Sequence, residues 1–372
     1  MSYRILLITF CLLFVVSSLV LAENTIKIGV NQPMTGQMAA GGELGMKGIN
    51  LAHELRPTVL GKKIELILVD NKSDKVDAAV AATKLIEKDK VIAILGSYGS
   101  SMSIPSGEVA NKNGIPMLTA TSTNPMVTQG KEYVFRACFI DPFQGEVMAK
   151  FTHEYLKLQK VALLIDIAND YSVGLAKFYK ETFEKLGGEI VASLYYQAGD
   201  QDFSAQISQI ISSGAQALFF PSYFQDAALI AIQARDLGFT GEFLGGDTLH
   251  NPVIVDLAKE SSEGLFASTF FAPDAPTTEI AANFVAKFKE KYDELPNAVS
   301  TLTFDAYNLM LDSIEKAGST EPEAIKNALA VTKNFVGAGG PIIINEEGDA
   351  IKPAVIVTIK DGEFKYYTTI QP

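Results

Sequence analysis

The hydrophobic pattern of this chain alternates short runs of β-branched residues with stretches that have the period of an amphipathic helix. The alternation starts at Ile26 and is typical of βαβ units built around parallel sheets. Its first part predicts strands separated by helices in regular order. The strands are expected at 26–30, 63–69, 91–95 and 116–118, and the helices at 43–55, 74–88 and 103–113.

A second series of the same kind follows the apolar run at 136–139. Gly187 and Gly188 after Leu186 are a typical helix stop, because glycine adopts the left-handed conformation at a helix end without steric cost. The series predicts helices at 143–156, 172–186, 203–212, 225–237, 277–292 and 302–317, and strands at 160–166, 189–195, 217–220, 242–244, 341–344, 354–359 and 364–367.

The N-terminal segment has the pattern of a secretory signal. Arg4 precedes an uncharged run at 5–21, and Ala22 supplies the small residue after which cleavage is expected. A retained membrane anchor is the alternative, since the run is nearly long enough to span a bilayer. The polar start of the mature chain favours cleavage, and Phe10 before Cys11 argues against a lipoprotein. The mature protein is therefore expected outside the cytoplasm.

Chain length and pattern together predict two lobes. The mature chain of about 350 residues exceeds what one compact core ordinarily holds. Nothing in it repeats at the short period of a solenoid. We therefore predict an α/β fold with two successive doubly wound lobes joined by crossings. A ligand cleft is expected between them, because open parallel sheets bind ligands beyond the carboxyl ends of their strands.

Composition and spacing exclude several classes of function. The net charge is -12 and Lys and Arg form no stripe, so nucleic acid is not an expected partner. Cys138 is the only mature cysteine, which allows no intramolecular disulfide. His53, His153 and His250 lie in no nucleophile motif or metal-ligand spacing, and the oxygen-rich segment 70–74 lacks the glycine and glutamate of a calcium loop. We expect no enzyme, metal or cofactor.

Two hydroxyl-rich segments carry the strongest functional signal. Residues 96–101 follow the strand at 91–95, and residues 119–125 follow the strand at 116–118. Small hydroxyl residues at such strand ends let the backbone approach an anion and add donors of their own. Helix N-termini at the same edge of the sheet favour negative charge. The pattern predicts a site for a small carboxylate.

With these motifs the chain resembles the periplasmic leucine/isoleucine/valine-binding family of solute receptors for ABC transporters. The likeness extends over nearly all of the mature chain and depends on the order and spacing of the motifs. They are Ile28-Gly29-Val30, Thr35-Gly36, residues 60–63, 96–101, 121–125, 141–145, 170–174, 202–204 and 233–235, and Gly348-Asp349.

The resemblance implies the type I periplasmic binding fold, with two doubly wound parallel-sheet lobes joined by a multi-strand hinge. The first lobe is expected to comprise residues 23–141 and about 270–340, and the second residues 142–269 and about 341–372. The family implies a periplasmic receptor, here expected to be a monomer, which captures a branched-chain or related amino acid by hinge closure. An inner-membrane ABC permease is the expected partner. A same-fold sensor that feeds a signalling protein, or a receptor for a non-α-amino or aromatic acid, stays open as an alternative.

The resemblance also places the ligand. Its carboxylate is expected at Ser100 and Thr123, and its ammonium at the main-chain carbonyl of Thr121 and at Asp247, where the family usually has glutamate. Capping of a nearby helix is the alternative for Ser100 and for Asp247. The remaining candidate ligand-binding residues are Tyr98, Ser122, Tyr171 and Tyr223.

Ordinary half-buried packing is the alternative role for the tyrosines. Relatives place a large aromatic residue near the position of Gly41, so this glycine implies a roomier pocket. The shorter Asp247 likewise makes a ligand of longer reach, such as a γ-amino acid, conceivable.

Overall fold

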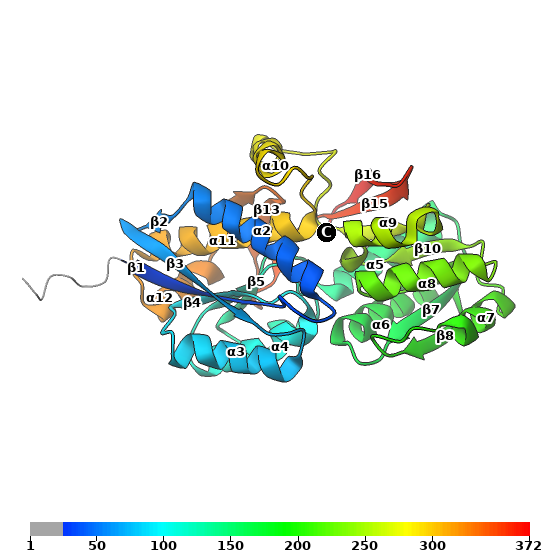
Figure 1. The fold of residues 1–372 in the computed structure, drawn as a ribbon, viewed down its shortest axis with the longest axis horizontal. Helices are drawn as coiled ribbons and strands as arrows, with labels where there is room; N and C mark the ends of the chain where they lie inside the picture. The colour runs from blue at the N-terminus through cyan, green and yellow to red at the C-terminus, as the bar shows by residue number, and fades with distance from the viewer. Residues whose placement is uncertain (1–24) are drawn as a thin grey trace, which may run out of the picture.

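The computed structural model describes residues 25–372 and shows two α/β lobes side by side, each built on its own sheet (Figure 1). The expected signal at 1–22, with its cleavage site after Ala22, lies outside the described residues. Within residues 25–372, no helix combines the length and apolar character needed to cross a membrane.

The first lobe is built on a sheet with strand order β2-β3-β1-β4-β5-β6, parallel except for β2. Helices α2 and α11 pack against each other, as do α3 and α4. Helices on both faces bury the central strands, which explains their continuous apolar runs. The elements are β1 (Thr25–Gln32), α2 (Ala39–Leu55), β2 (Thr58–Val59), β3 (Lys62–Asp70), α3 (Lys75–Glu87), β4 (Ala93–Gly96), α4 (Ser100–Lys112), β5 (Met117–Thr119), η1 (Pro125–Val127), β6 (Val134–Arg136), α10 (Glu279–Tyr292), α11 (Ala298–Ala317) and α12 (Pro322–Ala330).

The second lobe is built on a sheet with strand order β16-β15-β11-β10-β9-β7-β8, in which β15 and β16 are antiparallel to their neighbours. The elements are α5 (Asp141–Lys150), the π-helical turn η2 (Phe151–Tyr155), β7 (Lys160–Asp166), α6 (Asp170–Lys185), β8 (Glu189–Tyr196), α7 (Ser204–Ser212), β9 (Ala217–Phe219), α8 (Phe224–Asp236), β10 (Glu242–Gly245), η3 (Asp247–Leu249), α9 (Pro252–Ala258), η4 (Lys259–Ser262), β11 (Phe266–Thr269), β15 (Ala354–Lys360) and β16 (Glu363–Ile370).

The chain passes between the lobes after β6, after β11 and before β15. The last passage is preceded by a small sheet of β12 (Phe335–Gly337), β13 (Gly340–Ile344) and β14 (Ala350–Ile351). This small sheet contacts the first lobe, because Asp305 of α11 accepts hydrogen bonds from the N–H groups of Ala338 and Gly339, and Arg136 pairs with Asp349. Residues 341–351, expected in the second lobe, therefore lie on the first.

Most predicted elements are present, with shifted ends and some omissions. Helix α2 begins at Ala39 and α4 at Ser100, several residues before their predicted starts. Strand β11 and helix α12 were not predicted. Strand β11 has only four residues, two of them Ser and Thr, and is held by β10 and β15 on either side. Such a strand depends on its neighbours more than on its own propensity.

Candidate functional site

Ser100 begins α4 at the edge of the first lobe that faces the second. The turn before it needs Gly99, whose φ of 86° is in the left-handed region that favours glycine. Gly99 is the N-cap residue, so Ser100 is not the cap and the capping alternative is wrong. The buried Oγ of Ser100 instead accepts a hydrogen bond from the N–H of Asn124 over 3.2 Å. This bond joins the two hydroxyl-rich segments.

Thr121, Ser122 and Thr123 follow β5 and are all buried. The hydroxyl of Thr123 has no hydrogen-bond partner in the part of the chain that the structure describes. The hydroxyl of Ser122, by contrast, lies 2.8 Å from Oγ of Ser103 and donates to the carbonyl of Ser97 over 3.0 Å. The Thr123 hydroxyl is thus available to a ligand, whereas the Ser122 hydroxyl is bound to the segment that precedes α4 and to α4 itself.

Asp247 lies in the turn η3 just after β10, on the second lobe. Asn251 caps helix α9, so the capping alternative for Asp247 is wrong. Oδ1 of the buried Asp247 accepts a hydrogen bond from Nε2 of Gln144 over 2.9 Å. Burial raises the pKa of Asp247 to about 6, because a low-dielectric environment disfavours the charged form.

Three tyrosines form a continuous wall between the lobes. The ring centroids of Tyr98 and Tyr223 are 5.8 Å apart, and those of Tyr223 and Tyr171 are also 5.8 Å apart. All three side chains are buried, in place of the half-buried packing considered as the alternative. The hydroxyl of Tyr171 accepts from Thr248, whereas those of Tyr98 and Tyr223 have no partner among residues 25–372.

The space beside Gly41 is filled by Tyr98. A Cβ atom at Gly41 would lie 2.3 Å from Cε1 of the Tyr98 ring, far inside the contact distance. The tyrosine therefore packs directly on the backbone of α2. The expectation that Gly41 leaves a roomier pocket is wrong, because an aromatic ring from a different loop occupies that position.

Two residues of α5 that the sequence reasoning missed belong to the same cluster. Both carboxylate oxygens of Asp141 and Oε1 of Gln144 are buried, and within the described chain none has a hydrogen-bond partner. Burial, helped by the nearby charge of Asp247, raises the pKa of Asp141 to about 8. The motif at 141–145 contributes to the family resemblance, but an acid at a helix start is typical of an ordinary first-turn residue and gives no sign of a site.

Buried polar groups without partners are rare in folded proteins. Here they gather between the lobes: Tyr98, Thr123, Asp141, Gln144 and Tyr223 each contribute one or more. The hydroxyl groups come from both lobes, with Tyr98 and Thr123 on the first and Tyr223 on the second, and the carboxylates come from α5 and η3. The arrangement suits a small ligand that carries hydrogen-bonding groups of both signs.

A family model described as periplasmic binding protein matches residues 25–363. The chain belongs to the periplasmic binding protein family. The resemblance to leucine/isoleucine/valine-binding proteins is confirmed by the relatives. This periplasmic binding protein is 30% identical over 336 residues to the leucine-, isoleucine-, valine-, threonine- and alanine-binding protein of Pseudomonas aeruginosa, with 88% of each chain covered.

Two solved structures confirm the α/β class and the type I periplasmic binding fold. A leucine-binding protein of Thermotoga maritima shares 44% identity with this periplasmic binding protein at a TM-score of 0.92, covering 93% of this chain and 99% of that one. The branched-chain amino acid transporter substrate-binding protein of Streptococcus pneumoniae, solved with isoleucine, shares 31% identity at a TM-score of 0.89, covering 94% and 100%.

In this periplasmic binding protein the lobes touch directly around the site. Nδ2 of Asn124 in the first lobe donates to the carbonyl of Asp170 in the second over 2.7 Å. A Cβ atom at Gly99 would lie 3.0 Å from the hydroxyl oxygen of Tyr223. The structure therefore represents a closed arrangement of the two lobes.

The described residues offer little support for a metal site or for nucleophilic catalysis. Across 25–372, no group of three or more His, Cys, Asp or Glu side chains is placed to hold a metal ion. His53 contacts the hydroxyl of Tyr307, and His250 contacts that of Thr269. Neither histidine faces a serine or cysteine nucleophile in these contacts.

Proposed function

We propose that this protein is the periplasmic receptor of an ABC importer and binds a branched-chain or related amino acid between its lobes. The observation that carries the proposal is the buried acid Asp247 of the second lobe, which lies across the cleft from the buried residues Ser100 and Thr123 of the first. A zwitterion supplies a positive group for the acid and a negative group for the two hydroxyl groups. No covalent step is needed.

The negative end of the ligand is assigned to the first lobe. Ser100 is the first residue of α4, a helix of 13 residues, so unbonded N–H groups and the positive end of the helix dipole face the ligand. The free hydroxyl of Thr123 adds a donor. A carboxylate satisfies these groups with charge-assisted hydrogen bonds.

The positive end is assigned to Asp247, Asp141 and the carbonyl of Thr121. Two carboxylates buried at one site repel each other unless a cation or a proton lies between them. An amino acid brings an ammonium group that pairs with these carboxylates, whereas an aromatic acid brings only a further negative charge. The acids therefore favour an amino acid over the aromatic-acid alternative.

The nature of the side chain follows from the wall of tyrosines and from the relatives. Tyr98, Tyr171 and Tyr223 offer ring surface to an apolar group. The solved relatives at 44% and 31% identity are named for leucine and branched-chain amino acids. We infer leucine, isoleucine or valine as the first ligands to test.

Capture is proposed to proceed by hinge closure. The first lobe, with Ser100, Thr121 and Thr123, holds the ligand, and the second brings Tyr171, Tyr223 and Asp247 over it. Exclusion of water strengthens each ion pair, because the local dielectric constant falls. The closed shape then presents both lobes together to the permease.

The proposal is tested with the mature protein, residues 23–372, in a thermal-shift panel of amino acids and benzoates. A ligand at 100 times its Kd adds about 2.7 kcal/mol of stability and raises the Tm. We expect leucine, isoleucine or valine to raise it and benzoate to leave it unchanged. A shift with benzoate alone, or with no amino acid, would contradict the proposal. Ligand uptake by vesicles containing the permease separates a transport receptor from a sensor.

A further inference from the structure

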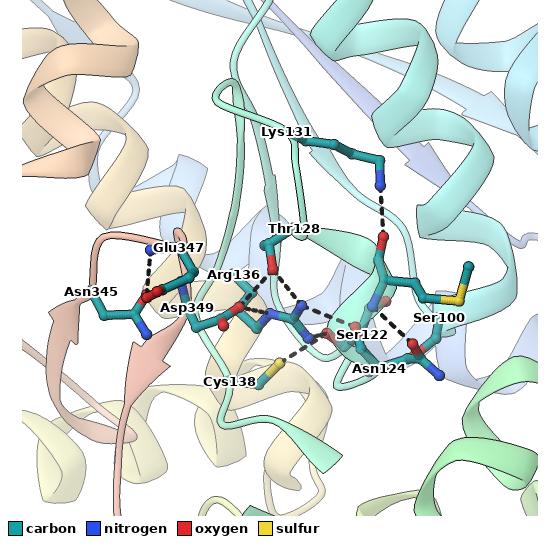
Figure 2. A network of polar contacts seen from close by, with 11 residues as sticks. Ser100, Ser122, Asn124, Thr128, Lys131, Arg136, Cys138, Asn345, Glu347 and Asp349 are labelled. Atoms are coloured by element: carbon teal, nitrogen blue, oxygen red, sulfur yellow. Dashed lines mark hydrogen bonds and ion pairs between the residues drawn. The ribbon is translucent and has the colours of Figure 1, made fainter. Parts of the chain in front are cut away.

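Arg136 ends β6 and is completely buried. It lies behind residues 120–128, which follow β5 and are called the ligand loop below. Its guanidinium donates to the carbonyl of Ser122 over 2.7 Å, to the carbonyl of Asn124 over 3.0 Å and to Oγ1 of Thr128 over 2.7 Å. Its Nε lies 2.6 Å from Oδ1 of Asp349 (Figure 2). One side chain thus holds three positions of the loop and one position of the turn between β13 and β14.

The two carbonyls that Arg136 binds flank Thr123. In a trans peptide the C=O and the following N–H point in opposite directions. Because the carbonyl of Ser122 points to Arg136, the N–H of Thr123 in the same peptide points away from Arg136. The guanidinium therefore fixes the orientation of a backbone donor beside the free Thr123 hydroxyl.

Asn124 connects the same loop to Ser100 and to the second lobe. Its N–H donates to Oγ of Ser100, and its Nδ2 donates to the carbonyl of Asp170. Figure 2 shows Asn124 between Ser100 and Arg136. A shift of the Asn124 backbone would therefore move Ser100, which is proposed to bind the ligand carboxylate. It would also break the contact with Asp170 that joins the lobes.

Asp349 connects Arg136 to the last passage between the lobes. Its Oδ1 also accepts from Oγ1 of Thr128 over 2.7 Å, and its N–H donates to Asn345 over 2.8 Å. Strand β14 and the passage into β15 follow directly. The ion pair also neutralises the guanidinium, so its effect on the ligand loop is chiefly geometric.

We propose that Arg136 is a positioning residue for ligand binding. Held by Asp349, it orients the peptide groups around Thr123 and Asn124 so that Ser100 can bind the ligand carboxylate and Asn124 can reach Asp170. The inference rests on the proposed function for its affinity readout. Its effect on lobe closure can be measured without any ligand.

The test compares R136Q, R136K and D349N with the wild type and with F288L. Phe288 is a buried core residue of α10 outside this network, so F288L controls for a general loss of stability. R136K keeps the charge but loses the planar fork that reaches two carbonyls. D349N leaves the loop contacts of Arg136 in place. It is the variant used to test the Arg136–Asp349 pair if R136Q does not fold.

Two readouts separate positioning from stability. Calorimetry with leucine on folded samples is expected to show affinity about tenfold weaker or more for R136Q and R136K, and a smaller loss for D349N. Energy transfer between dyes at K185C and K316C reports closure without ligand, and its closed population should fall in the same order. F288L should lower the Tm while leaving both readouts near the wild type.

Each outcome decides the inference. If R136Q and R136K lower the Tm but retain affinity and closure within twofold of F288L, Arg136 is purely structural and the proposal is wrong. If the wild type binds none of the amino acids, the proposed function fails. In that case a loss of the closed population in R136Q still supports the positioning role, and an unchanged population overturns it.

Discussion

Asp170 and Ser101 exchange two hydrogen bonds across the cleft. The N–H of Asp170 donates to Oγ of Ser101 over 3.0 Å, and that hydroxyl donates to Oδ2 of Asp170 over 2.9 Å. Nζ of Lys75 lies 2.9 Å from the same carboxylate oxygen. Because Asp170 begins α6 and Ser101 lies in the first turn of α4, the two helix N-termini meet when the lobes close. These contacts join the two lobes directly.

Removing this contact should weaken binding through faster release. In D170A the first-lobe contacts to the ligand stay intact, but the closed state loses its bonds to Ser101 and Lys75. We expect dissociation to accelerate about tenfold, since affinity changes at a closed site act mainly on release. Stopped-flow release of leucine measures this rate. K177A, at an exposed position on the same helix, is the control. Equal release rates in the two variants would contradict the role of Asp170 in holding the closed state.

Neutralising the acid of the second lobe should remove most of the affinity. In D247A a buried ammonium loses its partner, which costs about 2 to 5 kcal/mol of binding free energy. Calorimetry on a folded sample gives the value directly. D202A changes an exposed acid of the same lobe and should leave Kd unchanged. Unchanged affinity in D247A would remove this residue from the site.

Ligand affinity should rise with pH. Burial raises the pKa of Asp247 from 3.8 to about 6 and that of Asp141 from 3.8 to about 8. An ammonium pairs with the ionised carboxylates, so protons leave on binding, and Kd should fall as the pH rises from about 5 to about 8. Calorimetry in buffers of different ionisation enthalpy detects the released protons. D247N combined with D141N should show neither effect.

The same pKa shifts act on stability in the opposite direction. The unfolded chain loses the protons of both acids near pH 3.8, whereas the folded protein keeps them up to about 6 and about 8. Without ligand, the contribution of these acids to the free energy of unfolding is full at low pH and falls as the pH rises through this window. The difference in the free energy of unfolding by urea, between the wild type and the D141N and D247N double variant, measures this contribution. A difference independent of pH would contradict the assignment.

A methyl group at Gly41 should disturb the wall of tyrosines. G41A places Cβ 2.3 Å from the ring of Tyr98 and must displace it, so we expect weaker ligand binding. G45A on the same helix meets its nearest atom at 3.4 Å and provides the control. Alanine is a better helix former than glycine, and G45A should therefore retain affinity and gain up to about 1 kcal/mol of stability. Equal affinities in the two variants would show that Tyr98 is free to move.

Strand ends and helix starts were accessible from the chain alone. The run 91–95 before a hydroxyl-rich turn predicted that Ser100 would lie at the edge of a sheet, and β4 and α4 place it there. Local hydrophobic period and glycine at the turn suffice for this, because both act over a few neighbouring residues. The same reasoning could not find β11, whose four residues are held by strands distant in sequence.

The direction and burial of individual side chains could not be predicted from the local sequence pattern. Ser122 and Thr123 are adjacent hydroxyl residues in one turn, yet the hydroxyl of the first bonds to Ser97 and Ser103, and that of the second has no partner among residues 25–372. In sequence, Asp141 has the pattern of a common first-turn acid, but packing against α6 and a hydrogen bond from its N–H to the carbonyl of Thr123 place it in a buried position. Tyr98 replaces the bulk missing at Gly41 from a loop more than fifty positions away.

By itself the sequence determined the order of elements, the two-lobed α/β class and the strand ends at which ligand groups gather. These follow from the period of apolar positions and from turn residues, which are local properties. Only the tertiary structure decided which polar groups face the cleft, that Arg136 and Asp349 brace the loop around Thr123, and that residues 341–351 join the first lobe. Each of these depends on contacts between segments distant in the chain, where burial and hydrogen bonding select one arrangement among many that the local pattern allows.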